Sequence, residues 1–413
     1  TPTAGVVTFE GHNIHTEYAS LRTRIGMVPQ DDVVHRQLTV NQALGYAAEL
    51  RLPPDTSRAD REEVVAQVLD ELGLTQHADT RVDKLSGGQR KRASVALELL
   101  TGPSLLILDE PTSGLDPALD LQVMTMLRQL ADAGRVVLVV THSLTYLDVC
   151  DQVLLMAPGG KTAFCGPPGQ IGPAMGTTNW ADIFSTVAGD PDLGSLTSPK
   201  QGPPDQIGAA MGTTNWAQIF AKGGAAPDEA NRRFLAQNKP PPPAQTEAPA
   251  DLGVPPRTST RHQFFTVARR QVRLVVADRA YFVFLALLPF VMGALSLTVP
   301  GHTGFGYADP TSDSAGEAGT ILTLLTMAAA FMGTALTIRD LIGERPIFRR
   351  EQAVGLSTTA YLLAKIAVFC VFATGQAAVA TIIVRLGKGA PTAHPPFFGN
   401  STFSLFVTVA GTC

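Results

Sequence analysis

Charged residues are scarce in this chain of 413 residues: Asp, Glu, Lys and Arg make up 16% of it, whereas soluble domains have about a quarter. The formal net charge of −4 gives no sign of the basic domain that is typical of nucleic-acid binding, so we expect no nucleic-acid partner. Cysteine is rare too, with four residues and no CxxC pair, which argues against a disulfide framework or a zinc site. The first residues, TPTAGVVTFEG, lack the basic and apolar stretches of a signal peptide.

The composition changes twice along the chain and predicts three regions. Residues 1–165 mix helical and strand patterns, residues 166–260 hold a repeat and a Pro-rich stretch, and residues 261–413 contain long uncharged runs. In the middle region, GPPGQIGPAMGTTNWADIF (166–184) recurs at 202–220 with three changes. Two copies are too few for a solenoid, so we interpret them as a duplicated surface loop followed by an extended linker.

The first region alternates helix and strand signals. Ser57 and Asp60 have the spacing of a capping box, which predicts a helix that runs to Leu72 and stops at Gly73. The short apolar runs 105–108 and 136–140 are typical of strands buried on both faces of a parallel sheet. The alternation predicts an α/β layer fold.

The strongest local motif is Leu85-Ser-Gly-Gly-Gln89, which precedes an apolar helical pattern. The two glycines let a ligand approach the backbone, and the N-terminus of the following helix attracts anions. Ser86 adds a hydroxyl group. On its own, this motif would indicate no more than a helix cap.

A second motif supplies two carboxylates. Leu105-Leu-Ile-Leu-Asp109-Glu110 is an apolar strand pattern that delivers Asp109 to the carboxyl edge of a sheet, where ligands of α/β proteins bind. There Asp109 can hold Mg²⁺, usually through water, and Glu110 can orient or deprotonate an attacking water. The preceding LSGGQ and the following SGLD (113–116) make nucleotide hydrolysis the natural interpretation.

Together, LSGGQ, LLILDE, SGLD and Thr141-His142 resemble the nucleotide-binding domain of ABC transporters in order and spacing. The resemblance implies an α/β P-loop NTPase-type fold followed by an all-α transmembrane domain, with ATP and Mg²⁺ as cofactors. It implies catalytic roles for Glu110, as the base, and for His142, as the γ-phosphate contact. The residues that it assigns to cofactor binding are Gln30, Ser86, Gly87, Gly88, Gln89 and Asp116, and those that it assigns to the metal are Asp109 and Gln30.

The phosphate-binding loop of that family, GxxxxGK[ST], is not found among these residues. Gly160-Lys-Thr162 follows the histidine motif and has Leu155 where the first glycine should be, so it predicts a hairpin turn instead. We therefore expect a fragment, truncated at both ends, that hydrolyses ATP poorly by itself although the complete protein hydrolyses it.

Three uncharged runs, at 281–299, 318–338 and 366–384, are long enough to cross a bilayer, and a fourth begins at 401. The alternative is that these runs form buried helices of a soluble core, which is less favoured because three of them lie within about one hundred residues. Arginines precede the first run and lie between the second and third, whereas the loop between the first two has only acidic charges. By the positive-inside rule the N-terminal region is cytoplasmic, with Arg385 and Lys388 as exceptions.

An ATPase region followed by membrane spans resembles the G subfamily of ABC transporters, and residues 344–351 and 355–365 resemble its cytoplasmic segment between the second and third spans. The resemblance implies that this segment contacts the ATPase domain. It also implies a half-transporter that pairs with a second copy, contacts membrane lipid and exports an amphipathic or lipid-like substrate across the plasma membrane. The chain is similar as well to actinobacterial half-transporters that carry phosphopeptide-binding FHA domains upstream.

Two other classes of protein remain open. A soluble ABC ATPase of DNA repair or translation would share the nucleotide motifs but not the apolar runs. A catalytically silent binding partner or fragment would keep the fold without the chemistry.

Overall fold

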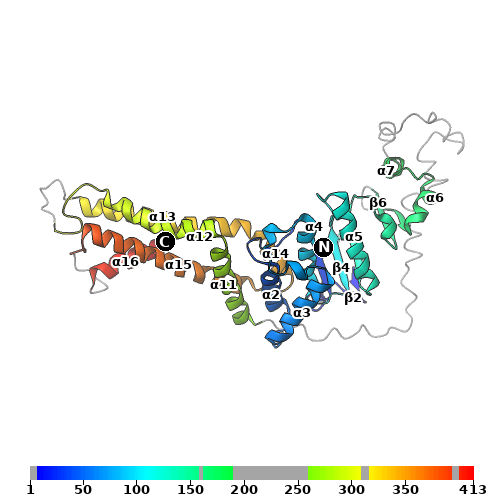
Figure 1. The fold of residues 1–413 in the computed structure, drawn as a ribbon, viewed down its shortest axis with the longest axis horizontal. Helices are drawn as coiled ribbons and strands as arrows, with labels where there is room; N and C mark the ends of the chain where they lie inside the picture. Colours follow the sequence, from blue (N-terminus) through cyan, green and yellow to red (C-terminus); the bar gives the residue numbers. More distant parts are fainter. Residues whose placement is uncertain (1–6, 158–160, 189–258, 308–315, 393–399) are drawn as a thin grey trace. The chain divides into compact units, whose positions relative to one another are not determined.

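A computed structural model describes residues 7–157, 161–188, 259–307, 316–392 and 400–413 (Figure 1). The second copy of the repeat (202–220) and the predicted linker (239–256) lie outside the described residues. The chain forms two compact units, one of Thr1–Thr16 with Thr112–Leu252 and the other of Glu17–Pro111 with Gly253–Cys413. The second unit therefore contains helices from the N-terminal region together with the predicted spans.

The N-terminal part of the second unit has a parallel strand pair. β3 (Ile25–Val28) pairs with β4 (Leu105–Asp109), with Val28 opposite Leu108. β4 buries Leu106 and Leu108, and helix α4 (Gly87–Leu99) packs against β3. The parallel pairing covered by a helix confirms the predicted α/β layer arrangement.

Each of the three longer helices of this part begins at a capping residue. α2 (Val40–Arg51), α3 (Arg58–Glu71) and α4 each have a capping box, in which the N-cap side chain and that of the residue three positions later each accept a backbone N–H. The predicted box of Ser57 and Asp60 is confirmed. α3 ends before Gly73, whose φ of 62° suits glycine.

The first unit holds the remaining strands. α5 (Pro117–Asp132) packs against β5 (Val136–Val140), while β1 (Thr8–Phe9) and β2 (His12–Asn13) form a short hairpin. The prediction that β5 is buried on both faces is wrong, since Val136, Leu138 and Val140 are 61%, 49% and 53% exposed. Within this unit α5 packs against β5, and the alternate side chains of the strand stay uncovered.

A small hairpin follows in the same unit. β6 (Val153–Ala157) pairs antiparallel with β7 (Lys161–Gly166), which confirms the two strands of the predicted hairpin, while its turn at 158–160 lies outside the described residues. The first copy of the repeat then forms α6 (Ile171–Met175) and α7 (Trp180–Ala188). Its prediction as a surface loop is wrong, because Ile171 and Ile183 are buried with Phe164 of the hairpin.

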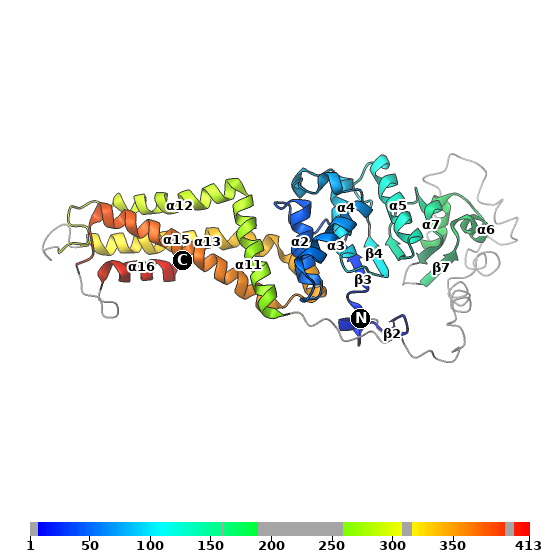
Figure 2. The same ribbon diagram turned by 60° about the horizontal axis from the view of Figure 1, so that its bottom comes forward.

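The last part of the second unit is helical. Three helices are long and apolar enough to cross a membrane: α12 (Arg279–Leu297), α13 (Glu317–Gly343) over Glu317–Ile338, and α15 (Thr358–Lys388). They confirm the three predicted spans, and α16 (Ser401–Thr412) confirms the start of the fourth apolar helix. In Figure 2 these helices run side by side, while α11 (Thr260–Ala277), which was not predicted, runs across their ends.

Polar contacts join the long helices and the loop between α12 and α13, and two of them bear on the predictions. Lys388 donates from Nζ to Oε1 of Glu317 at 2.8 Å, and Glu317 also accepts from Thr303. The charge of Lys388 is therefore paired within the chain, but Lys388 still counts as an exception, because the positive-inside rule counts Lys and Arg rather than net charge. The second contact lies within the spans, where Gln376 of α15 donates from Nε2 to the backbone oxygen of Leu285 in α12 at 2.8 Å.

Gln376 bonds to the Leu285 carbonyl, which lacks its usual partner within the helix because residue 289 is proline. Pro289 lies inside α12 and has no N–H with which to bond Leu285 four residues earlier. We expect Gln376→Leu to destabilise the helical part by about 1 kcal/mol, a typical cost for a hydrogen bond between membrane helices. The cost should shrink when Pro289→Ala restores the N–H within the helix.

A double-mutant cycle measured by unfolding in detergent checks this prediction. Val291→Ala, at an exposed position of the same helix, provides the control background, in which the cost of Gln376→Leu should stay the same. An equal cost in the Pro289→Ala background would contradict the role assigned to the proline.

Candidate functional site

The SGGQ motif forms the first turn of α4. Ser86 is the N-cap residue: its Oγ accepts the Gln89 N–H at 3.3 Å, and its own N–H donates to Oε1 of Gln89 at 3.0 Å. The side-chain amide of Gln89 also lies 3.0 Å from Nε2 of His77. Gly87 and Gly88 then begin the helix, so backbone N–H groups and the positive end of the helix dipole gather where the sequence predicted an anion site.

The predicted metal and base residues lie at one edge of the sheet. Asp109 ends β4, and Glu110 follows it with a φ of 46°, in the left-handed region that non-glycine residues rarely adopt. Because Val28 pairs with Leu108, Gln30 and Glu110 each follow this pair by two residues at the carboxyl ends of the strands. Strained backbone is common at functional sites, which agrees with the role predicted for Glu110.

A buried lysine joins α4 to the segment that follows β3. Lys91 is 3% exposed, and its Nζ donates to the backbone oxygen of Gln30 at 2.9 Å and lies 3.3 Å from Oδ1 of Asp32. The sequence reasoning missed Lys91, although its position two residues after LSGGQ, in a helix with a buried apolar face, was a signal. The contact links the predicted anion site to the predicted Gln30 segment.

The other two predicted site residues belong to the first unit. Asp116 is the N-cap residue of α5, with its Oδ1 accepting the N–H groups of Ala118 and Leu119 at 3.0 Å each. His142 follows β5 and is exposed. Among the described residues no three His, Cys, Asp or Glu side chains gather as a metal site. The nucleotide and Mg²⁺ roles of all these residues therefore stay predictions.

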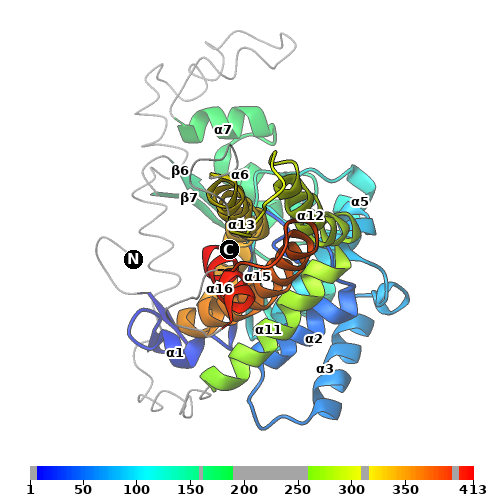
Figure 3. The same cartoon turned by 90° about the vertical axis from the view of Figure 1, so that its left-hand side faces the viewer.

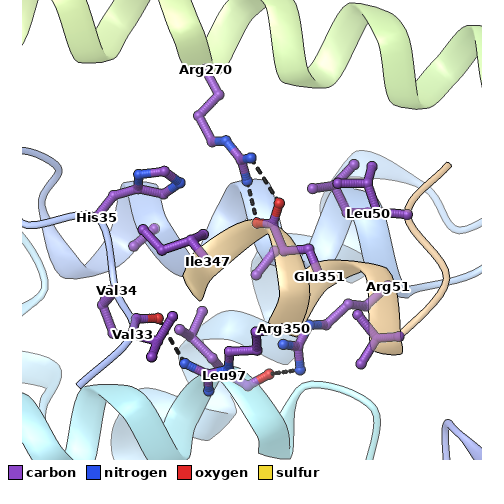
Figure 4. Close-up of a pocket in the computed structure, with 14 residues that line it drawn as sticks. Val33, Val34, His35, Leu50, Arg51, Leu97, Arg270, Ile347, Arg350 and Glu351 are labelled. Atoms are coloured by element: carbon purple, nitrogen blue, oxygen red, sulfur yellow. Dashed lines mark hydrogen bonds and ion pairs between the residues drawn. The ribbon is translucent and has the colours of Figure 1, made fainter. Parts of the chain in front are cut away.

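The segment between the second and third spans forms α14 (Arg345–Ala353) and contacts α4 directly. Arg350 donates to Oε1 of Glu98 at 2.7 Å, to the backbone oxygen of Ser94 at 2.7 Å and to that of Val33 at 2.8 Å. Figure 4 shows Arg350 reaching Val33 from α14. The predicted contact between this segment and the ATPase region is confirmed.

Glu98 lies between two guanidinium groups. Arg51 of α2 donates to both carboxylate oxygens at 3.0 Å, and Arg350 approaches from α14. Burial by itself would raise the pKa of Glu98, but Arg51 and Arg350 lower it to about 2. The carboxylate thus stays ionised and joins three helices at one point.

α11 holds α14 from its other side. Arg270 forms a buried ion pair with Glu351, in which Nη2 and Oε2 are 2.8 Å apart (Figure 4). Gln263 donates to the backbone oxygen of Gly355 at 3.1 Å and accepts the Ser357 N–H at 3.0 Å. α14 is therefore bonded both to α11, the helix that precedes the first span, and to the ATPase region.

His35 lines a cavity beside the Arg270–Glu351 pair and is 7% exposed (Figure 4). Its Nδ1 lies 3.8 Å from Oε1 of Glu344. Burial, followed by the charge of Arg270, lowers the pKa of His35 to about 3. The folded protein therefore keeps this imidazole neutral at pH values at which an unfolded chain would protonate it.

Stability should consequently fall as the pH drops from 7 to 5.5. In that window the unfolded chain binds a proton at His35 and the folded one does not, which corresponds to a loss of about 1 kcal/mol. We expect His35→Gln to remove this part of the pH dependence, and His15→Gln, at an exposed position, to leave it unchanged. Thermal unfolding in detergent at the two pH values is the measurement, and equal slopes for His35→Gln and the parent would contradict the assignment.

Two family models match the chain: "ABC transporter" over residues 1–113 and "ABC-2 type transporter" over residues 262–413. An ABC transporter ATP-binding/permease protein of Mycobacterium tuberculosis is 67% identical over 413 residues, which are 100% of this chain and 44% of the relative. ABC transporter G family member 28 of Arabidopsis thaliana is 43% identical over 155 residues, 36% of this chain and 14% of the relative. A broad substrate specificity ATP-binding cassette transporter of Bos taurus is 39% identical over 156 residues, 36% of this chain and 24% of the relative. The chain thus spans less than half the length of each of these relatives.

Proposed function

Because the chain joins the ATPase region of ABC transporters to the membrane region of ABC-2 type transporters, we propose that it works in a half-transporter that couples ATP hydrolysis to substrate export. The observation that carries the proposal is the contact of Arg350 in α14 with Glu98 in α4. One helix of that contact begins at the SGGQ motif, and the other lies between two spans. A displacement of the first can therefore reach the second through a buried ion pair.

The nucleotide step requires a second copy. The N-terminus of α4 offers an anion site to a phosphate group, and in our proposal that phosphate belongs to ATP held by the partner subunit. Asp109 and Gln30 would hold Mg²⁺, which would neutralise charge on the phosphates, Glu110 would take the proton of the attacking water, and His142 would contact the γ-phosphate. These roles are the ones that the sequence motifs imply. The placement of Gln30, Asp109 and Glu110 at one edge of the sheet supports them.

The mechanical step follows from the contacts of α4. When ATP draws the N-terminus of α4 toward the partner, Glu98 moves with the same helix and Arg350 with Glu98. Arg350 displaces α14, which also contacts α11 through the Arg270–Glu351 pair. The motion then reaches α13, which ends before α14, and α15, which begins after it. Hydrolysis of ATP returns the helices to their starting positions.

We infer an amphipathic or lipid-like substrate and the plasma membrane as the location. The chain's resemblance to the G subfamily and the uncharged faces of the spans support this class of substrate. The Bos taurus relative is named for broad substrate specificity, which agrees with recognition by apolar surface rather than by a fixed set of charges.

The test is Mg²⁺-ATP hydrolysis by the full-length gene product reconstituted in lipid vesicles, with this 413-residue chain measured beside it. We expect hydrolysis by the full-length protein, dependent on protein concentration as a dimer requires, and little by this chain. A full-length protein that binds ATP without hydrolysing it would instead favour a catalytically silent partner. Release from membranes by salt without detergent would favour a soluble ATPase.

A further inference from the structure

α11 has two different faces. Its inner face carries Gln263, Arg270 and Gln271, which bond to α13, α14 and the turn after α14. Its outer face presents an exposed apolar stripe formed by Phe265, Val272 and Val276. At about 100° per residue these three side chains fall within a narrow arc of the helix.

Arginines flank the stripe on both sides. Arg261 lies at one border, with its guanidinium carbon 6.0 Å from the centre of the Phe265 ring, and Arg269 and Arg273 lie at the other. Arg269 is paired with Glu49 at 2.8 Å. Arg273, and Arg279 just after α11, are exposed and have no ion-pair partner among the residues that the structure describes.

The direction of α11 suits a membrane boundary. Seen along the spans in Figure 3, α11 lies across them, and only Asp278 separates it from α12. Asp278 caps α12 by accepting the Tyr281 N–H at 3.2 Å, so the chain turns sharply from one helix into the next. A helix with this position and an apolar stripe between arginines matches the physical requirements of the headgroup layer of a bilayer.

We propose that the outer face of α11 binds the anionic phospholipid headgroups of the leaflet from which α12 enters the membrane. Phe265, Val272 and Val276 insert among the upper acyl chains, and Arg273 and Arg279 each bind a lipid phosphate. Arg269 and Arg270 do not take part, because each is committed to a carboxylate of this chain. The proposal rests on insertion of the spans in a membrane but not on ATP hydrolysis.

The test uses a tryptophan at the centre of the stripe. Phe265→Trp in a chain with Trp180→Phe and Trp216→Phe is reconstituted in vesicles that contain brominated phosphatidylglycerol or brominated phosphatidylcholine at equal mole fraction. We expect the anionic lipid to quench the tryptophan more strongly, with a relative affinity of roughly tenfold or more, and the preference to weaken at high salt. The double variant Arg273→Gln/Arg279→Gln should lose the preference.

The control double variant, Arg58→Gln/Lys84→Gln, removes the same formal charge from exposed positions outside the helical membrane part and should keep the preference. Equal quenching by the two lipids in the parent would overturn the proposal, as would an unchanged preference in Arg273→Gln/Arg279→Gln. Quenching by neither lipid would show that α11 does not touch the bilayer. Because no nucleotide is added, a protein without ATPase activity can still show the lipid preference. Failure of the proposed function is therefore distinguishable from failure of this proposal.

Discussion

Glu98→Gln is expected to lower the free energy of unfolding of the second unit by about 3–5 kcal/mol, the usual cost of breaking a buried ion pair from one side. The amide fits the space of the carboxylate but leaves Arg51 and Arg350, which are 4% and 8% exposed, facing each other without a countercharge. Chemical unfolding in detergent, followed by helix content, is the measurement. Glu62→Gln, in an exposed pair with Arg58, should cost under about 1 kcal/mol.

A neutral replacement of all three charges separates stability from coupling. Arg51→Met, Glu98→Leu and Arg350→Met together remove the buried charges, so most of the lost stability should return. The link between α4 and α14 would then be apolar, and we expect ATP hydrolysis in the full-length protein to lose its response to transport substrate. A triple variant that is stable and still fully coupled would refute the role proposed for this contact, and so would a Glu98→Gln effect no larger than that of Glu62→Gln.

The parts of the site that could be predicted are those that local sequence determines. Ser86 caps α4 through a residue three positions away, and Asp109 ends a strand because an apolar run stops there. A capping box, a strand end and an apolar span each depend on neighbouring residues, so their patterns survive in the sequence. The nucleotide motifs and the three spans were found for this reason.

The parts that could not be predicted depend on partners far away in the chain. Arg350 bonds to Glu98 across 252 positions, and Lys91 bonds to Gln30 across 61. Hydropathy treats Arg269, Arg270, Arg273 and Arg279 as one basic cluster, whereas the structure gives Arg270 a buried carboxylate and leaves Arg273 exposed. The wrong prediction for β5 has the same origin, since an apolar run does not reveal how many of its faces are covered.

Glu110→Gln should reduce ATP hydrolysis by the full-length protein by about 100-fold or more, because an amide cannot take the proton of the attacking water. ATP binding should be retained, so the closed, nucleotide-bound dimer should accumulate and be visible as a change in mass. Asp132→Asn makes the same chemical change at the exposed end of α5 and should leave the rate unchanged.

The backbone at Glu110 provides a second, independent test. A non-glycine residue at a φ of 46° stores strain that Glu110→Gly would release, so this variant should be no less stable than the parent although it also loses hydrolysis. Loss of activity without loss of stability would mean that the position is kept strained for chemistry rather than for folding. Hydrolysis that persists in both variants would remove Glu110 from the catalytic step and transfer the role of base to another residue of the full-length protein.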